Sequence, residues 1–159
     1  MATQIRTKPV AIVDDDVPML MKKTKPIAIV DDDDPPPRKK TKLVAIVDDD
    51  DSMRSALQGL LKSVGLPAQA YASAEEFLNS GQQRQTACLI ADIRMPGMSG
   101  LELQTKLNIE NCRIPTIFIT AHGDAKMRMQ ALRAGAVEFL SKPFDDEALL
   151  ESVRAALET

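Results

Sequence analysis

The sequence has no apolar run approaching the ~20 residues that a membrane-spanning helix needs. Nor does its N-terminus carry a stretch as long as a signal peptide requires, because the run Val10–Val13 ends at Asp14. Cysteine is scarce, and the only two, Cys88 and Cys112, lack the spacing of a metal site or of a redox pair. We therefore expect reduced thiols and a cytoplasmic protein with no membrane contact.

An excess of basic residues is also missing. The chain has 20 Lys and Arg against 23 Asp and Glu, for a net charge of -3. This balance argues against a nucleic-acid-binding surface, and we expect no direct nucleic-acid binding by this chain. A length of 159 residues with 44% hydrophobic residues is ordinary for one globular domain.

Residues 1–40 lack glycine and aromatic residues altogether, yet they hold six of the ten prolines. They also carry eight basic and seven acidic residues. Such a segment can bury little apolar surface, so we predict a mostly disordered N-terminal extension over residues 1–40. All seven glycines lie in residues 41–159, the predicted folded domain.

A 17-residue repeat is written three times, beginning at Thr7, Thr24 and Thr41. Each copy is a short apolar run that ends in consecutive aspartates. Pro18 and Pro35–Pro37 oppose a helix after the first two copies, whereas a helical pattern follows the third. The third copy is therefore predicted to form the first strand and the other two to be spare copies, of which the second could replace the third at a modest entropic cost.

From Thr41 onward, strand and helix patterns alternate five times, which predicts a parallel sheet with helices on both faces. Ser52 is a candidate N-cap for the first helix, and Ser73 with Glu76 has the spacing of a capping box. Strands are predicted at residues 42–48, 67–72, 87–92, 114–120 and 136–141, and helices at 53–64, 73–80, from 101, at 124–135 and at 145–158.

Polar residues follow four of these strands. Asp48 and Asp49 follow the first strand, Asp92 ends the third, Thr120 ends the fourth, and Lys142 follows the fifth. Parallel strands have their carboxyl ends at one edge, where ligands bind near the point at which strand order reverses. We expect these five side chains to converge there.

Clustered carboxylates repel one another by about 1 kcal/mol at ~4 Å in water, and by more where they are partly buried. A cation relieves this repulsion, and hard oxygen ligands favour magnesium or calcium over zinc. Lysine and threonine side chains on the same rim can bind phosphoryl oxygens, and a carboxylate can itself form an aspartyl phosphate. The pattern is typical of phosphoryl transfer, which requires mainly positioning and charge neutralisation.

Four motifs and the spacing between them resemble the receiver domain of bacterial response regulators, the CheY-like family: "VDDDDSMR", "LIADIRMPGMSG", "FITAHG" and "GAVEFLSKPF". The resemblance covers residues 41 to about 157. The stretches "IRMPGMSGLEL" and "SAEEFL" make it nearest to receivers of the nitrogen-fixation-type two-domain regulators. It implies a flavodoxin-like sheet of order 2-1-3-4-5. It also implies a signalling protein, not an enzyme, that promotes its own phosphorylation and dephosphorylation.

By this resemblance Asp92 is the phosphoacceptor, and a sensor histidine kinase is the phosphodonor. Asp48 and Asp49 hold Mg²⁺ together with Asp92, and Arg94 offers its backbone carbonyl to the ion. Phosphorylation is expected to switch a partner-binding face and to allow homodimerisation.

The same resemblance makes Thr120 the switch hydroxyl and places Phe139 at the switch aromatic position. Lys142, before a proline that is usually cis in the family, pairs with the phosphoryl group. A plain core role for Phe139 stays open as the alternative. His122, the only histidine, is interpreted as incidental in preference to a phosphohistidine.

Two other functions stay open. "AIVDDDD" also resembles the nucleophile motif of haloacid-dehalogenase phosphatases, with Asp48 as the nucleophile, although the usual Thr or Val after the motif is missing. The second alternative is an interaction module that is never phosphorylated. Met127 and Met129 fit either core filling or an adaptable partner surface.

Overall fold

The computed structural model describes residues 42–121 and 123–158. These residues belong to a compact unit that spans Thr41–Thr159. The predicted disordered extension, the two spare copies of the repeat and His122 lie outside the described residues, so those predictions stay untested.

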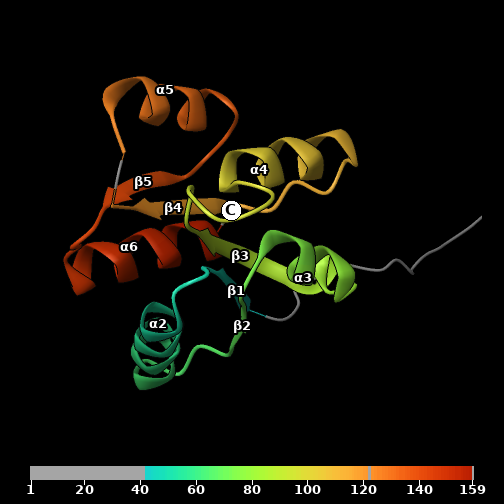
Figure 1. Ribbon diagram of the computed structural model, residues 1–159. Helices are drawn as coiled ribbons and strands as arrows, with labels where there is room; N and C mark the ends of the chain where they lie inside the picture. The colour runs from blue at the N-terminus through green and yellow to red at the C-terminus, as the bar shows by residue number, and fades with distance from the viewer. Residues whose placement is uncertain (1–41, 122, 159) are drawn as a thin grey trace, which may run out of the picture. The chain divides into compact units, whose positions relative to one another are not determined.

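Five parallel strands form one sheet in the order β2-β1-β3-β4-β5. This confirms the predicted fold class and strand order (Figure 1). The strands are β1 (Leu43–Val47), β2 (Ala68–Tyr71), β3 (Thr86–Ala91), β4 (Thr116–Thr120) and β5 (Glu138–Ser141).

The central strands are buried on both faces, which explains why their sequences are continuous apolar runs. In β1, Ala45 and Val47 pack into one core cluster, while Val44 and Ile46 pack into the other. The alternation of side chains along a strand sends neighbouring residues to opposite faces. Helices therefore have to cover both sides of the sheet.

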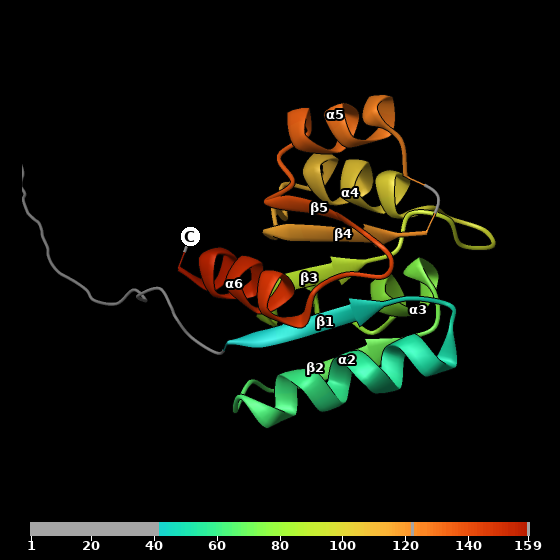
Figure 2. The same ribbon diagram turned by 90° about the vertical axis from the view of Figure 1, so that its left-hand side faces the viewer.

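The helices divide between these two faces. Core residues of α2 and α6 pack in the cluster with Val44 and Ile46, and those of α3, α4 and α5 pack in the cluster with Ala45 and Val47. Figures 1 and 2 show this three-layer arrangement. The helices are α2 (Asp51–Ser63), α3 (Ala74–Asn79), α4 (Gly100–Ile109), α5 (Ala125–Arg133) and α6 (Asp146–Leu157), with a short 3₁₀ turn at Gln83–Gln85.

The prediction that Ser52 caps the first helix is wrong. The N-cap of α2 is Asp50, whose Oδ1 accepts a hydrogen bond from the backbone N–H of Ser52 at 2.9 Å. Both residue types cap helices well, and the run of aspartates lets the helix begin two residues earlier than the apolar pattern indicates.

The predicted capping box at Ser73 and Glu76 is half formed. Ser73 Oγ accepts from the N–H of Glu76, as predicted, but Glu76 Oε1 accepts from the N–H of Ala72 and not from Ser73. A complete capping box forms instead at the start of α4, between Ser99 and Glu102.

The last helix and β3 complete the described core. Leu149, Val153 and Ala156 lie on the buried side of α6, and Leu157 packs against them. Cys88 is a buried, free thiol in β3, where burial raises its pKa to about 12. Among residues 42–121 and 123–158, no helix is long and apolar enough to cross a membrane.

Candidate functional site

The topology places four polar positions at the carboxyl edge of the sheet. β1 and β3 are neighbours, and Asp48 and Asp92 directly follow them. Thr120 is the last residue of β4, and Lys142 directly follows β5. Strand order reverses between β1 and β3, which is where open α/β sheets bind their ligands.

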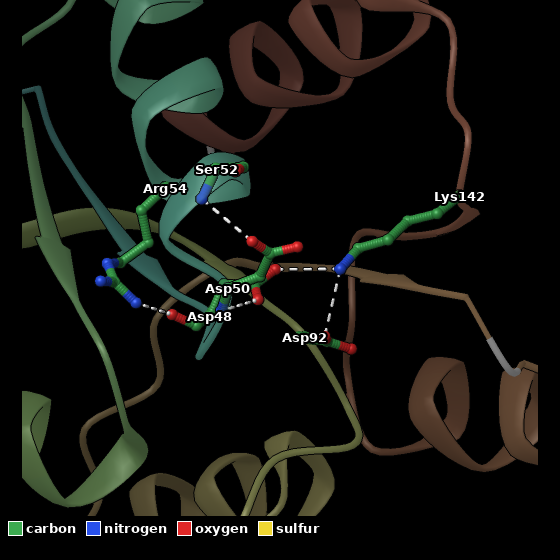
Figure 3. A network of polar contacts seen from close by, with 6 residues as sticks. All are labelled: Asp48, Asp50, Ser52, Arg54, Asp92 and Lys142. Atoms are coloured by element: carbon green, nitrogen blue, oxygen red, sulfur yellow. Dashed lines mark hydrogen bonds and ion pairs between the residues drawn. The ribbon is translucent and has the colours of Figure 1, made fainter.

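Lys142 joins the two buried carboxylates. Its Nζ lies 3.0 Å from Asp48 Oδ2 and 3.1 Å from Asp92 Oδ2 (Figure 3). All three side chains are largely shielded from water. Ion pairs that are shielded in this way are screened less than surface pairs, so the amine holds the two strand ends together.

Burial and charge act in opposite directions on these groups. Burial raises the pKa of Asp48, and the hydrogen bonds from the backbone of Asp50 and from Lys142 only partly offset it. Burial lowers the pKa of Lys142, but its hydrogen bonds and attraction to Asp48 and Asp92 outweigh burial, so the net shift is upward. Lys142 is therefore a cation at neutral pH, whereas the fold disfavours the charged form of Asp48.

Asp49 completes an acidic cluster. One carboxylate oxygen from each of Asp48, Asp49 and Asp92 lies within 4.8 Å of the others. Three carboxylates and one lysine leave a formal charge of -2 in this small volume. A divalent cation would neutralise that charge, and carboxylate oxygens are the ligands that Mg²⁺ and Ca²⁺ prefer. The residues present fit such an ion.

The two carboxylate oxygens of Asp92 differ in their hydrogen bonding. Its Oδ2 accepts from Lys142, while Oδ1 is the only buried side-chain N or O atom in the described part of the chain without a hydrogen-bond partner. A buried oxygen without a hydrogen-bond partner lowers the stability of the folded state, because it loses its hydrogen bonds to water. Such atoms in native proteins call for an explanation, such as a bound ion or a catalytic role.

The four consecutive aspartates do different things. Asp48 is the buried member of the cluster, and its Oδ1 accepts a hydrogen bond from the N–H of Asp50. Asp50 caps α2, and Asp51 forms an ion pair with Arg54. Arg54 Nη1 also donates to the backbone oxygen of Asp48 at 2.8 Å (Figure 3). The sequence reasoning missed this contact of Arg54, although the residue stood in the motif "VDDDDSMR".

Thr120 and Phe139 lie together beside Gly123. Both Thr120 and Phe139 are buried. A Cβ added at Gly123 would lie 2.6 Å from Phe139 Cε1 and 2.9 Å from Thr120 Cγ2. The loop after β4 therefore leaves no room at Gly123 for a side chain beside Phe139 and Thr120. The sequence reasoning missed the role of Gly123. A glycine is the only sequence sign of close packing beside Thr120 and Phe139, and glycine occurs in many loops for other reasons.

The loop after Asp92 is held from two directions. Glu75 Oε2, from α3, accepts a hydrogen bond from the N–H of Met98, and the N–H of Gly100 donates to the oxygen of Ile93. Arg94 is exposed in this loop, and the role of its carbonyl stays a prediction. The part played by Glu75 was not anticipated from the sequence.

Comparison with known proteins identifies the class that this fold and site define. The family described as "Response regulator receiver domain" matches residues 44–154. The chain therefore belongs to the receiver domain family of two-component response regulators. Its homologues in this family are signalling proteins, and the resemblance seen in the sequence is confirmed.

Individual relatives agree with this assignment. Nodulation protein W of Bradyrhizobium diazoefficiens is 52% identical over 107 residues, which cover 67% of this chain and 47% of that protein. Transcriptional regulatory protein FixJ of Azorhizobium caulinodans is 44% identical over 106 residues, covering 67% and 50%. The chain thus spans about half the length of the curated relatives it matches.

Solved structures show the same fold. The response regulator StyR has a TM-score of 0.69 at 46% identity, covering 73% of this chain and 59% of that chain. The structure named FixJ-N has a TM-score of 0.67 at 38% identity, covering 76% and 96%.

Proposed function

We propose that this chain is a phosphoryl acceptor that takes a phosphoryl group on Asp92 from a phosphohistidine of a sensor histidine kinase. The observation that carries the proposal is the unpartnered Oδ1 of Asp92, beside an acidic cluster and a lysine within the described residues. Family membership supports the same reaction class.

In the proposed step, Asp92 Oδ1 attacks the phosphorus atom. The P–N bond to the imidazole breaks, its electron pair stays on the nitrogen, and the new O–P bond makes an aspartyl phosphate. Oδ2 is held by Lys142 during the attack, which fixes the orientation of the carboxylate. Later attack of water on the phosphorus would release inorganic phosphate and restore Asp92.

Asp48, Asp49 and Asp92 are the proposed ligands of Mg²⁺, with the backbone carbonyl of Arg94 as a further ligand. The ion, when bound, supplies positive charge to the phosphoryl oxygens. Arg54 and Asp50 fix the backbone and side chain of Asp48 and so keep the site arranged for the ion.

Lys142 and Thr120 are the proposed contacts for the transferred group. The Lys142 amine already lies 3.1 Å from Asp92 Oδ2, so it is placed to bind a phosphoryl oxygen on that residue. Thr120 lies at the end of the neighbouring strand β4 and carries a hydroxyl that can donate to another oxygen. Lys142 precedes Pro143 through a cis peptide bond.

Signal output is proposed to pass through Thr120 and Phe139. Because an added Cβ at Gly123 would meet both side chains, Thr120 and Phe139 border the same small space, and a movement of the Thr120 side chain toward a phosphoryl group would change the room beside the Phe139 ring. That change would alter the face formed by α5 and β5. A partner protein or a second copy of this chain would bind there, and a cytoplasmic location belongs to the same proposal.

The phosphatase alternative has less support. Both oxygens of Asp48 accept hydrogen bonds, Oδ1 from Asp50 and Oδ2 from Lys142, and a hydrogen bond makes an oxygen a weaker nucleophile than one without a partner. The free oxygen belongs to Asp92. Geometry and family membership both favour Asp92.

The test is phosphorylation of the Asp92→Asn variant by acetyl phosphate in the presence of Mg²⁺. The carboxamide has nearly the shape of the carboxylate but is a poor nucleophile, so we expect phosphate incorporation to fall by at least about 100-fold. Asp146→Asn, an exposed aspartate in the first turn of α6, is the matched control and should be phosphorylated like the parent.

Mapping the acid-labile phosphoryl group in the parent separates the three functions. Label on Asp92 supports the receiver, label on Asp48 would support the phosphatase, and no label would support the interaction module. Full incorporation into Asp92→Asn would remove Asp92 from the mechanism.

A further inference from the structure

We propose that Glu75, on α3, is a positioning residue for the candidate metal site, although its side chain is not one of the proposed ligands. Its carboxylate fixes the conformation of the loop that follows Asp92, residues 93–99, and thereby raises the affinity of the acidic cluster for Mg²⁺. This inference deepens the proposed function and rests on it, because the loop carries Arg94, whose backbone carbonyl is a proposed ligand of the ion.

The base of this loop is closed by its own backbone. The N–H of Gly100, at the start of α4, donates to the oxygen of Ile93 at 2.9 Å. A Cβ at Gly100 would lie 2.2 Å from the backbone oxygen of Asp92, so the two ends of the loop are packed closely together. These contacts fix where the loop starts and ends, but they leave the conformation of residues 94–98 to other interactions.

Glu75 supplies the contact that reaches residues 94–98. Its Oε2 accepts a hydrogen bond from the N–H of Met98 at 2.9 Å, across 23 residues of sequence. Within residues 42–121 and 123–158, this is the one hydrogen bond that joins residues 94–98 to another helix or strand. Figure 2 shows α3 and the loop at the same end of the sheet.

Gly97 gives a second, independent sign of this contact. A Cβ added at Gly97 would lie 2.7 Å from Glu75 Oε2, so the carboxylate would have to move away. Gly97 also has a φ of 77°, a conformation that is unfavourable for residues with a Cβ. The loop backbone therefore turns directly against the Glu75 carboxylate, and glycine at this position preserves both the turn and the contact.

Glu75 lies on a well-anchored helix. Its neighbours in α3, Ala74 and Phe77, are 0% exposed and pack in the core. The N-cap of α3 is Ser73, which places Glu75 in the first turn, where the helix dipole favours a carboxylate. Because the backbone of Glu75 is fixed in this way, its carboxylate can hold the loop in one conformation.

The conformation of the loop affects metal binding because Mg²⁺ requires near-octahedral geometry from its oxygen ligands. Arg94 lies between the two bonded positions, Ile93 and Met98, so the direction of its carbonyl depends on both of them. Without the bond to Glu75, the loop would lose more conformational freedom when the ion binds. Loss of a group that orients a metal ligand typically lowers metal affinity by roughly 10–100-fold.

Isothermal titration calorimetry of the full chain with MgCl₂ tests this inference. We expect Glu75→Ala to weaken Mg²⁺ binding by about 10-fold. Glu75→Gln keeps an acceptor oxygen and nearly the same shape without the charge, so it should bind Mg²⁺ within about 2-fold of the parent. Glu147→Ala is the matched control and should bind Mg²⁺ like the parent, because Glu147 is likewise an exposed glutamate at the second position of its helix.

A second measurement follows the loop in the absence of Mg²⁺. Amide hydrogen exchange at Met98 should be about 10-fold faster in Glu75→Ala than in the parent, because the Met98 N–H loses its acceptor. Exchange in the central strands β1 and β3 should stay unchanged. That difference separates a local change in the loop from a general loss of stability.

Three results would overturn the inference: equal Mg²⁺ affinity in Glu75→Ala and the parent, equal losses in Glu75→Ala and Glu75→Gln, or an equal loss in Glu147→Ala. The second result would mean that the charge of Glu75 acts and not its hydrogen bond. A parent that binds no Mg²⁺ would overturn the inference together with the proposed metal site.

Phosphorylation by acetyl phosphate tests the proposed function separately. A parent that binds Mg²⁺ in a Glu75-dependent way but takes up no phosphate would support the role of Glu75 and contradict the proposed function. Normal phosphate uptake by the parent, with unchanged Mg²⁺ affinity in Glu75→Ala, would support the proposed function and contradict the role of Glu75.

Discussion

At the scale of single residues, Asp48 has the strongest conflict between its chemistry and its surroundings. It is 1% exposed, and burial raises its pKa despite the hydrogen bonds from Asp50 and Lys142. A carboxyl whose folded pKa is raised binds protons more tightly in the folded state. Its ionisation therefore lowers stability as pH rises from its ordinary value of 3.8 through the folded pKa.

We predict that Asp48→Asn stabilises the metal-free protein at pH 7, by a few degrees in melting temperature, because the amide carries no charge to bury. Near pH 3 the gain should disappear, since Asp48 is then protonated in both the folded and unfolded states. Thermal unfolding in EDTA at the two pH values measures the difference. A variant that is less stable than the parent at pH 7 would show that the pair with Lys142 outweighs burial.

At the scale of elements, α2 depends on an aspartate at its N-terminus. Asp50 Oδ1 accepts from the N–H of Ser52, and the Ser52 side chain is exposed. We predict that Asp50→Ala lowers the free energy of unfolding by about 1 kcal/mol. Ser52→Ala is the matched control and should change it by less than about 0.5 kcal/mol. Urea titration of both variants checks the assignment, and a larger effect at Ser52 would restore the sequence-based prediction.

Two helical glycines allow the effect of helix propensity on stability to be measured apart from the effect of packing. Gly59 in α2 has nothing within 4 Å of an added Cβ, whereas a Cβ at Gly100 would lie 2.2 Å from the backbone oxygen of Asp92. We predict that Gly59→Ala stabilises the protein by about 0.5–1 kcal/mol. Gly100→Ala should destabilise it by at least about 2 kcal/mol, because backbone has to move.

The same unfolding titration compares the two glycine variants. Equal effects would mean that the loop after Asp92 adapts freely to a side chain. It would then not be held by Glu75 and Gly100 as the hydrogen bonds indicate.

Element types could be predicted from the sequence, but several element ends and close contacts could not. The apolar run at residues 43–47 and the 3.6-residue spacing after it specify a strand and a helix. The choice between Asp50 and Ser52 as cap depends on backbone angles that either residue permits. The approach of Gly100 to Asp92 depends on tertiary packing, which periodicity does not encode.

At the scale of the whole molecule, sheet topology determines the site. Asp48 and Asp92 are far apart in the chain but meet because β1 and β3 are neighbours. This meeting could be predicted, since alternating strands and helices imply a parallel sheet whose carboxyl ends share an edge. The contacts of Arg54 and Glu75 could not, because long polar side chains on helices usually face solvent and their sequence positions do not mark exceptions.

The acidic cluster also links the stability of the whole domain to divalent cations. Its three carboxylates lie within 4.8 Å of one another only in the folded chain, and they come from the ends of two strands. An ion that binds this arrangement and not the unfolded chain adds about 2.7 kcal/mol at 100 times its dissociation constant. We predict that saturating Mg²⁺ raises the melting temperature by roughly 10 °C relative to NaCl of equal ionic strength.

Asp49→Ala provides the matched variant for this titration, because Asp49 is the exposed member of the cluster. Losing one of three like charges should make the metal-free protein more stable than the parent and should reduce the Mg²⁺-dependent rise. The two effects have opposite signs, so a general loss of stability cannot produce both. A melting temperature that stays constant over a wide Mg²⁺ titration in the parent would exclude a metal site at this edge of the sheet.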